Sequence, residues 1–342
     1  MTKVEMMQGP KRATTVLLAF ILLTTGFADY WEYSKAYHAD PAIYADILHG
    51  TAIAPNQYRI GVIATADFMA RHAHVGLRHA FVLIDMVAGF AAVFTLFALL
   101  RRSAVYRVAS QQGRWFAALA FLILVQFYMA WVTWYQRPET LTTAALVTLT
   151  LLLLTMRVPL PGVAGYVATA GGMLLIAVAQ GFVRADVAFG LHAGVLLFCL
   201  TRASAGLSLP RAMQAATSLL AVFAAAGIQY YMMHIRYPQA SYGDTPVFQL
   251  VLNVKEPARL IAFTLFIVPY AWTVKTVLRR QVAAEAPAMG LLCGSAVFMA
   301  MWWMAGRVEE VRIFLPFALA LVPLTVQCAV ERWVLEKRPQ EA

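Results

Sequence analysis

Apolar residues in this chain come in blocks of about 16 to 22, long enough for a helix to cross roughly 30 Å of hydrocarbon. Polar segments separate the blocks, and the strict apolar–polar alternation of a membrane β-barrel is absent. The pattern predicts an all-α, polytopic transmembrane helical protein with about ten crossings. The expected spans are residues 14–31, 79–100, 115–135, 141–156, 163–180, 186–200, 212–230, 259–274, 288–304 and 313–330.

Composition supports the same class of protein. Of 342 residues, 61% are hydrophobic and 13% are charged, a balance that a soluble domain of this length does not carry. No soluble domain or internal repeat is evident, so residues 1–342 are expected to form a single integral-membrane domain. Cys199, Cys293 and Cys328 all lie in apolar blocks, where packing is a sufficient explanation for them.

Basic residues set the expected orientation. The net charge is +10, and compact basic clusters such as "LLRR" and "VLRR" stand next to the ends of apolar blocks. Such clusters are typical of the cytoplasmic side of a membrane protein, where they contact anionic lipid headgroups. Nucleic-acid binding is therefore not needed to explain the net charge. We therefore expect cytoplasmic termini, a long first outer loop at 32–78 and a second at 231–258. Nearly all acidic residues outside the tails then fall on the outer side.

The first outer loop predicts a short amphipathic helix on the membrane surface. Asp40, Tyr44, Ile47 and Leu48 share one helical face, and Pro41 suits the first turn. Asp40 fits equally well as the N-cap of this helix or as a carboxylate that takes a proton from a substrate hydroxyl. Residues 56–72, "NQYRIGVIATADFMARH", predict a second amphipathic stretch before the next span.

Arginines at outer helix ends run against the positive-inside tendency. Arg59, Arg184 and Arg312 are the main members of this group. Each has two interpretations, because a guanidinium either snorkels to the headgroups or binds a phosphate through its planar fork. Several such arginines on one side favour a phosphate site.

Two outer helix starts combine an arginine with an acid. In "EEVRIFLP", Glu309 and Arg312 are three residues apart and are expected to face the same side of a helix that enters the membrane. In "VRAD", Arg184 and Asp186 form a similar pair. A local ion pair explains both, but charges this close to hydrocarbon are costly unless they face protein or water, so a site is the default hypothesis.

The histidines of "RHAHVGLRH" at 72, 74 and 79 do not predict a metal site. No acid or cysteine follows them at ligand spacing, and histidines at a membrane interface commonly contact headgroups. The sequence indicates no cofactor, and a divalent cation is not indicated either.

The segments "DPAIY", "QYR", "VRAD" and "EEVRIFLP" together resemble bacterial integral-membrane glycosyltransferases of the GT-C superfamily and their relatives. The resemblance implies a bacterial inner membrane location, a periplasmic active face, and transfer of a sugar from a polyprenyl-phosphate donor to a lipid or glycan acceptor. It places the catalytic acid at Asp40, then Asp46 or Asp29. The resemblance implies donor binding by Tyr44, Tyr58, Arg59, Arg184, Glu309 and Arg312. The proline usual after "YR" is absent here, and no tandem acid pair follows the first span.

Two alternatives come from other functional classes. A transporter or flippase for a lipid-linked substrate has polar groups inside the membrane, and Asp85 and Gln126 are the main ones here. A non-catalytic scaffold subunit would account for the aromatic segments "MWWM" and "YYMM" as interfacial belts. Such belts suit every hypothesis, so they do not discriminate among them.

Overall fold

The computed structural model describes residues 16–31, 42–134, 137–201, 206–241, 248–279 and 284–337. These residues form helices joined by short connections and contain no strand, which confirms the all-α prediction. The first helix is Val16–Trp31. The others are α2 (Ala42–His49), α3 (Ile60–Ala73), α4 (Leu77–Arg102), α5 (Ala104–Val108), α6 (Gln111–Trp134), α7 (Glu139–Thr155), α8 (Gly162–Thr201), α9 (Arg211–Tyr231), α10 (Leu250–Lys255), α11 (Pro257–Leu278), α12 (Ala286–Ala305), α13 (Leu315–Ala320) and α14 (Val322–Lys337).

Length and apolar composition make membrane crossing plausible for most long helices. In the described part of the chain, 6 helices pass this test, or 7 if the pair α13 and α14, bent by 56°, counts as one span. Val16–Trp31 and α7 are shorter apolar helices. The last expected span, 313–330, is therefore not one straight helix but breaks at Leu321. Ten crossings remain a prediction.

Helix α8 doubles back on itself at Arg184. A straight helix places residues 173 and 199 about 39 Å apart, at 1.5 Å per residue. Residues 173 and 199 nevertheless both contact the first turn of α9. Nε2 of Gln214 lies 3.6 Å from Sδ of Met173, and Arg211 donates a hydrogen bond to the carbonyl of Cys199. The backbone at Arg184 is non-helical, with φ −156° and ψ 88°. One extended residue thus replaces the short loop expected at 181–186.

Two glycine pairs let α8 and α12 approach closely. "GLHAG" puts Gly190 and Gly194 one turn apart on α8, and "GLLCG" does the same for Gly290 and Gly294 on α12. A Cβ added at Gly194 would lie 2.1 Å from the backbone nitrogen of Gly294. Backbones this close need glycine on both sides, as in small-residue helix crossings in membranes.

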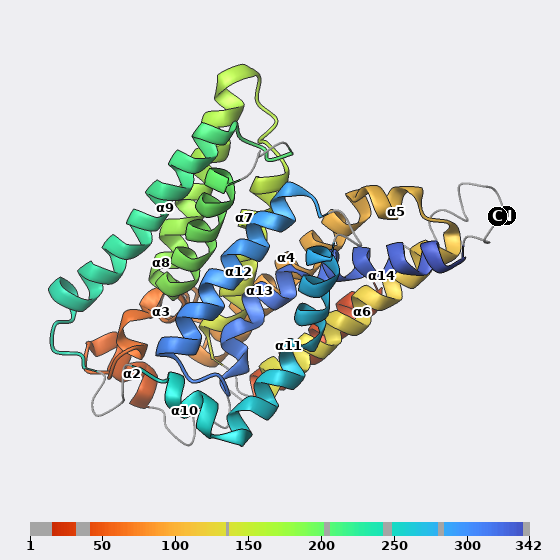
Figure 1. The fold of residues 1–342 in the computed structure, drawn as a ribbon. Helices are drawn as coiled ribbons and strands as arrows, with labels where there is room; N and C mark the ends of the chain where they lie inside the picture. Colours follow the sequence, from red (N-terminus) through yellow and green to blue (C-terminus); the bar gives the residue numbers. More distant parts are fainter. Residues whose placement is uncertain are drawn as a thin grey trace.

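The short helices gather at one end of the bundle. Figure 1 shows α2, α3 and α10 together at the bottom, whereas α5 lies near the opposite end. Tyr44 and Ile47 of α2 are buried against α3, at 6% and 4% exposure, as expected for an amphipathic helix. Asp40 lies outside the described residues, so its capping role is not placed. We call this the α2–α10 end.

Candidate functional site

Four charged side chains from three separate segments form an ionic cluster at the α2–α10 end. Arg59, which precedes α3, has its Nη1 3.1 Å from Oε1 of Glu139, the first residue of α7. Nη1 of Arg312 lies 3.9 Å from the same Glu139 oxygen, and its Nη2 lies 2.6 Å from Glu310 Oε2. Glu139 therefore links Arg59 and Arg312, 253 positions apart in the chain.

Glu139 is ionised in this environment. Its side chain is only 8% exposed, and burial alone would raise the pKa of the carboxyl. The guanidiniums of Arg59 and Arg312 outweigh that effect and hold the pKa below its ordinary value. The interaction between the acid and its two arginines therefore persists at neutral pH.

Arg184 and Asp186 form a second ion pair at the reversal of α8. Arg184 is 2% exposed, and its Nε lies 3.2 Å from Oδ1 of Asp186 while its Nη2 contacts Oδ2. Trp302 of α12 donates its indole N–H to the same carboxylate, at 2.8 Å. The guanidinium also lies 5.5 Å from the Trp302 ring centroid, a cation–π distance. The reversal is thus fixed by three interacting side chains.

A cavity of about 540 Å³ lies beside both charged groups. We call it the first cavity. Arg59, Asp186, Gln229 and His234 supply polar groups to its lining. Most of the remaining lining is apolar or aromatic, from the α8 reversal, α9 and α12. Apolar walls with a few convergent polar groups are typical of sites for amphiphilic small molecules.

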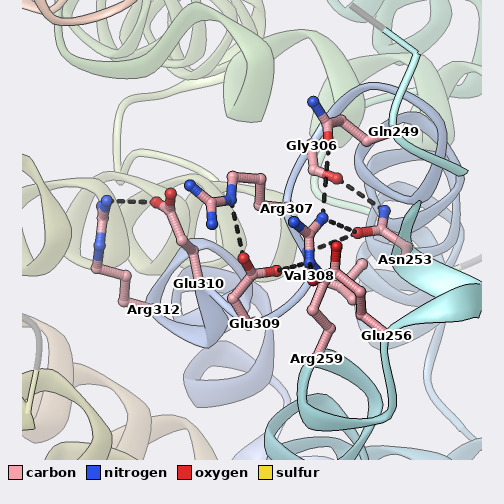
Figure 2. Close-up of polar contacts among 10 residues, drawn as sticks. All are labelled: Gln249, Asn253, Glu256, Arg259, Gly306, Arg307, Val308, Glu309, Glu310 and Arg312. Atoms are coloured by element: carbon pink, nitrogen blue, oxygen red, sulfur yellow. Dashed lines mark hydrogen bonds and ion pairs between the residues drawn. The ribbon is translucent and has the colours of Figure 1, made fainter. Parts of the chain in front are cut away.

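The segment before the last span does not have the predicted helical geometry. Residues 307–310 form turns, and Val311–Phe314 form a single short helical turn, so Glu309 and Arg312 do not share a helix face. Glu309 instead lies 2.8 Å from Arg307 and 3.4 Å from Arg259 of α11, as Figure 2 shows. The expected pairing within this segment was wrong because the chain turns before it enters the helix.

Asn253 of α10 holds this turn in place. Its amide nitrogen donates to the carbonyl of Trp303. The same nitrogen donates to the carbonyl of Gly306, and the amide oxygen accepts from the backbone of Val308 (Figure 2). Arg259 completes the network through Asn253 and Gln249, each at 3.4 Å. Helix α10 therefore positions the segment that carries Arg312.

Two of the three predicted catalytic acids, Asp46 and Asp29, do not line the first cavity. Asp46 is exposed on α2, and its carboxylate accepts a hydrogen bond from Thr51. Asp29 is 1% exposed and lies against the carboxyl of Asp85, which is equally buried. Asp40, the first choice, is outside the described residues. Among the described acids, Asp186 is the one that lines this cavity.

The two predicted tyrosines occupy structural positions. Tyr58 is 5% exposed, lines the first cavity and donates from its hydroxyl to the carbonyl of Ala240. Tyr44 packs on Phe81, with ring centroids 5.0 Å apart, and burial raises its pKa to about 12. Tyr58 thus ties α3 to the segment after α9.

Glu139, Trp302 and His234 were not predicted as site residues. Glu139 follows Arg137 and Pro138 at the start of a helix, where a carboxylate is an ordinary first-turn residue. Trp302 belongs to "MWWM", which has the composition of an interfacial belt. In the sequence these side chains look like ordinary helix-start and interface residues. Only their contacts in the folded protein identify them as site residues.

Comparison with known proteins gives no family. No protein-family model, curated protein or solved structure matches the chain. Within the residues that the structure describes, no group of three or more His, Cys, Asp or Glu side chains is placed to hold a metal ion. The site is therefore interpreted from its own geometry.

Proposed function

We propose that this protein is an integral-membrane glycosyltransferase of the GT-C type, a hexosyl- or pentosyltransferase that uses a polyprenyl-phosphate-linked sugar. One observation carries the proposal: the first cavity has apolar walls suited to a lipid and a charged end built from Arg59 and Asp186. A lipid phosphate beside hydrocarbon needs both kinds of surface at once.

In this proposal Arg59 contacts the donor phosphate. Although it also pairs with Glu139, Arg59 lines the first cavity, whereas Arg184 and Arg312, 2% and 5% exposed, do not. Those two act as positioning residues, since they hold Asp186 and Glu139 in place. His234 lies on the same cavity wall and supplies a second polar contact.

Transfer requires that the bond between the sugar's anomeric carbon and the phosphate oxygen break while a bond to the acceptor oxygen forms. The polyprenyl phosphate leaves with the bonding electrons, and a carboxylate takes the acceptor's hydroxyl proton. In this proposal Asp186, the described carboxylate that lines the first cavity, takes that role, and Asp40 is the alternative from the resemblance. The acceptor is a lipid or a glycan.

The placement in the membrane is part of the proposal. We propose ten crossings, counting the two antiparallel parts of α8 separately, with both termini cytoplasmic and the α2–α10 end in the periplasm of a bacterial inner membrane. Support comes from the reversal at Arg184 and from the basic clusters at helix ends.

A transporter or flippase of lipid-linked substrates is the second candidate. Asp29 and Asp85 favour it, because two carboxyls buried between apolar helices mark proton or ion pathways in membrane proteins. They lie on Val16–Trp31 and α4 and do not line the first cavity. A transferase does not have to move its substrate across the bilayer, and a lipid donor explains the lining of the first cavity more directly. A non-catalytic scaffold subunit remains the third interpretation, with no observation specific to it.

A density map of the protein in nanodiscs with added polyprenyl phosphate tests the proposal. We expect the phosphate within hydrogen-bonding distance of Arg59 and the isoprenoid chain along α9 and α12. A phosphate bound outside the first cavity, or no bound lipid, would contradict the donor site.

A further inference from the structure

A second cavity lies beside the segment 307–312. It measures about 400 Å³ and is lined by Trp131 of α6, by the start of α11 and by four charged residues of the segment. The charged residues are Arg307, Glu309, Glu310 and Arg312. We call this the second cavity, and it shares none of its lining residues with the first.

The charged groups that line the second cavity balance one another. Two guanidiniums and two carboxylates line it, and they pair with one another: Arg307 with Glu309 at 2.8 Å, and Arg312 with Glu310 at 2.6 Å. An anionic ligand would gain from the arginines but would be repelled by both carboxylates. A neutral ligand that both donates and accepts hydrogen bonds suits the lining better.

The carboxylates and Arg307 are accessible to a ligand. The side chain of Arg307 is 54% exposed, and those of Glu309 and Glu310 are 26% and 29% exposed. Carboxylate oxygens accept from hydroxyls, and guanidinium groups donate to hydroxyl oxygens. Trp131 adds an aromatic wall that packs edge-on to Phe266 at 6.0 Å. Hydroxyl-binding charges beside an indole suit the polar edges and apolar C–H faces of a sugar ring.

From this lining we propose that the second cavity binds the polyhydroxylated part of a neutral glycan or glycolipid. The inference goes beyond the proposed function, because it holds whether the protein transfers, transports or only binds its ligand. Under the transferase proposal the second cavity holds a part of the acceptor away from its reacting hydroxyl, because the base Asp186 lines only the first cavity. Arg312 lines the second cavity, and Glu139 connects it to Arg59 in the first.

Saturation-transfer NMR on the full-length protein in phosphatidylcholine nanodiscs tests this binding without any donor. The probes are D-glucose, D-mannose, N-acetyl-D-glucosamine and L-arabinose, with sn-glycerol 3-phosphate as the anionic comparison. We expect saturation transfer to at least one neutral sugar and weaker transfer to the phosphate. No transfer to any of the four sugars, or stronger phosphate binding that persists in the first-cavity variant Arg59→Gln, would overturn the proposal.

Variants connect the signal to the second cavity. Trp131→Leu should weaken sugar binding about two- to tenfold, the range for loss of an aromatic contact. Trp115→Leu is the matched control, because Trp115 lies at the other end of α6 and does not line the cavity. Arg307→Gln, at an exposed side chain, should weaken binding without disturbing the fold. Equal weakening by Trp115→Leu, or unchanged binding in both cavity variants, would reject the assignment.

Because these measurements include no polyprenyl lipid, failure here would leave the transferase proposal standing. Failure of the donor-site map would in turn leave the second cavity intact. The two results are therefore distinguishable.

Discussion

Arg59 and Glu139 are 80 positions apart, yet their side chains meet at 3.1 Å with exposures of 13% and 8%. The contact joins the start of α3 to the start of α7 and brings Arg312 within 3.9 Å of the same oxygen. A carboxylate between two guanidiniums lets three largely buried charges coexist in the protein interior, where any one alone would be costly.

The first prediction concerns the stability that Glu139 provides. Glu139→Gln leaves Arg59 and Arg312 buried without their shared acid and should lower the unfolding free energy by about 3 kcal/mol. Glu256→Gln is the control, because the Glu256 side chain is 49% exposed in its pair with Arg259. This substitution should lower the unfolding free energy by about 1 kcal/mol or less. Equilibrium unfolding in mixed micelles measures both, and equal effects would contradict a special role for Glu139.

The second prediction concerns the crossing of α8 and α12. Gly194→Ala places a methyl group against the backbone of Gly294 and should destabilise the protein by about 2 kcal/mol or more. Gly171→Ala, also in α8, meets nothing within 4 Å and should leave stability unchanged or raise it by up to about 1 kcal/mol. Thermal unfolding of the two variants is the measurement. A stable Gly194 variant would mean that the helices pack differently.

The third prediction tests the reversal of α8. In a background without native cysteines, Leu160→Cys and Leu207→Cys should react from the same side of the membrane, and Asp46→Cys from the opposite side. A membrane-impermeant maleimide on intact and opened cells reports this. If positions 160 and 207 labelled from opposite sides, α8 would cross only once. If Asp46→Cys labelled only from the cytoplasm, the periplasmic assignment of the α2–α10 end would fail.

The amino-acid pattern predicted the helical class, because apolar block length directly reflects bilayer thickness. It also predicted the helix around Tyr44 and Ile47 and the Arg184–Asp186 pair, since these depend on residues close in sequence. The break at Leu321 was not predicted, although Pro323 stands in the first turn of α14, where proline commonly begins a new helix.

Long-range relationships decide the rest of the site. Glu139 pairs with Arg59 and Arg312 only because α7 begins beside them. Trp302 reaches the Asp186 carboxylate only because α12 passes the reversal of α8. The expected partnership of Glu309 with Arg312 failed because the chain turns before the helix, so that Glu309 pairs with Arg307 and with the distant Arg259 of α11. A local helix pattern cannot represent such a partner.

The fourth prediction separates the candidate bases. Asp186→Asn removes the base and also the acid that pairs with buried Arg184, so turnover should fall about 100-fold or more, and thermal unfolding with donor binding shows how much of the loss comes from the fold. Asp40→Asn should leave turnover nearly unchanged if Asp40 only caps α2, because Asn and Asp rank together at that position. Kinetics of both variants give the answer. A large loss only in Asp40→Asn would move the catalytic role to the first loop.

The most direct test of the account measures release of polyprenyl phosphate from radiolabelled polyprenyl-phosphate sugars by the purified protein in proteoliposomes that contain envelope lipid and glycan extract. We predict that the protein releases polyprenyl phosphate and moves label into the acceptor fraction, and that Arg59→Gln reduces this turnover at least tenfold by removing the phosphate contact. Movement of intact donor across the bilayer with no label in the acceptor, or full turnover in Arg59→Gln, would contradict the account.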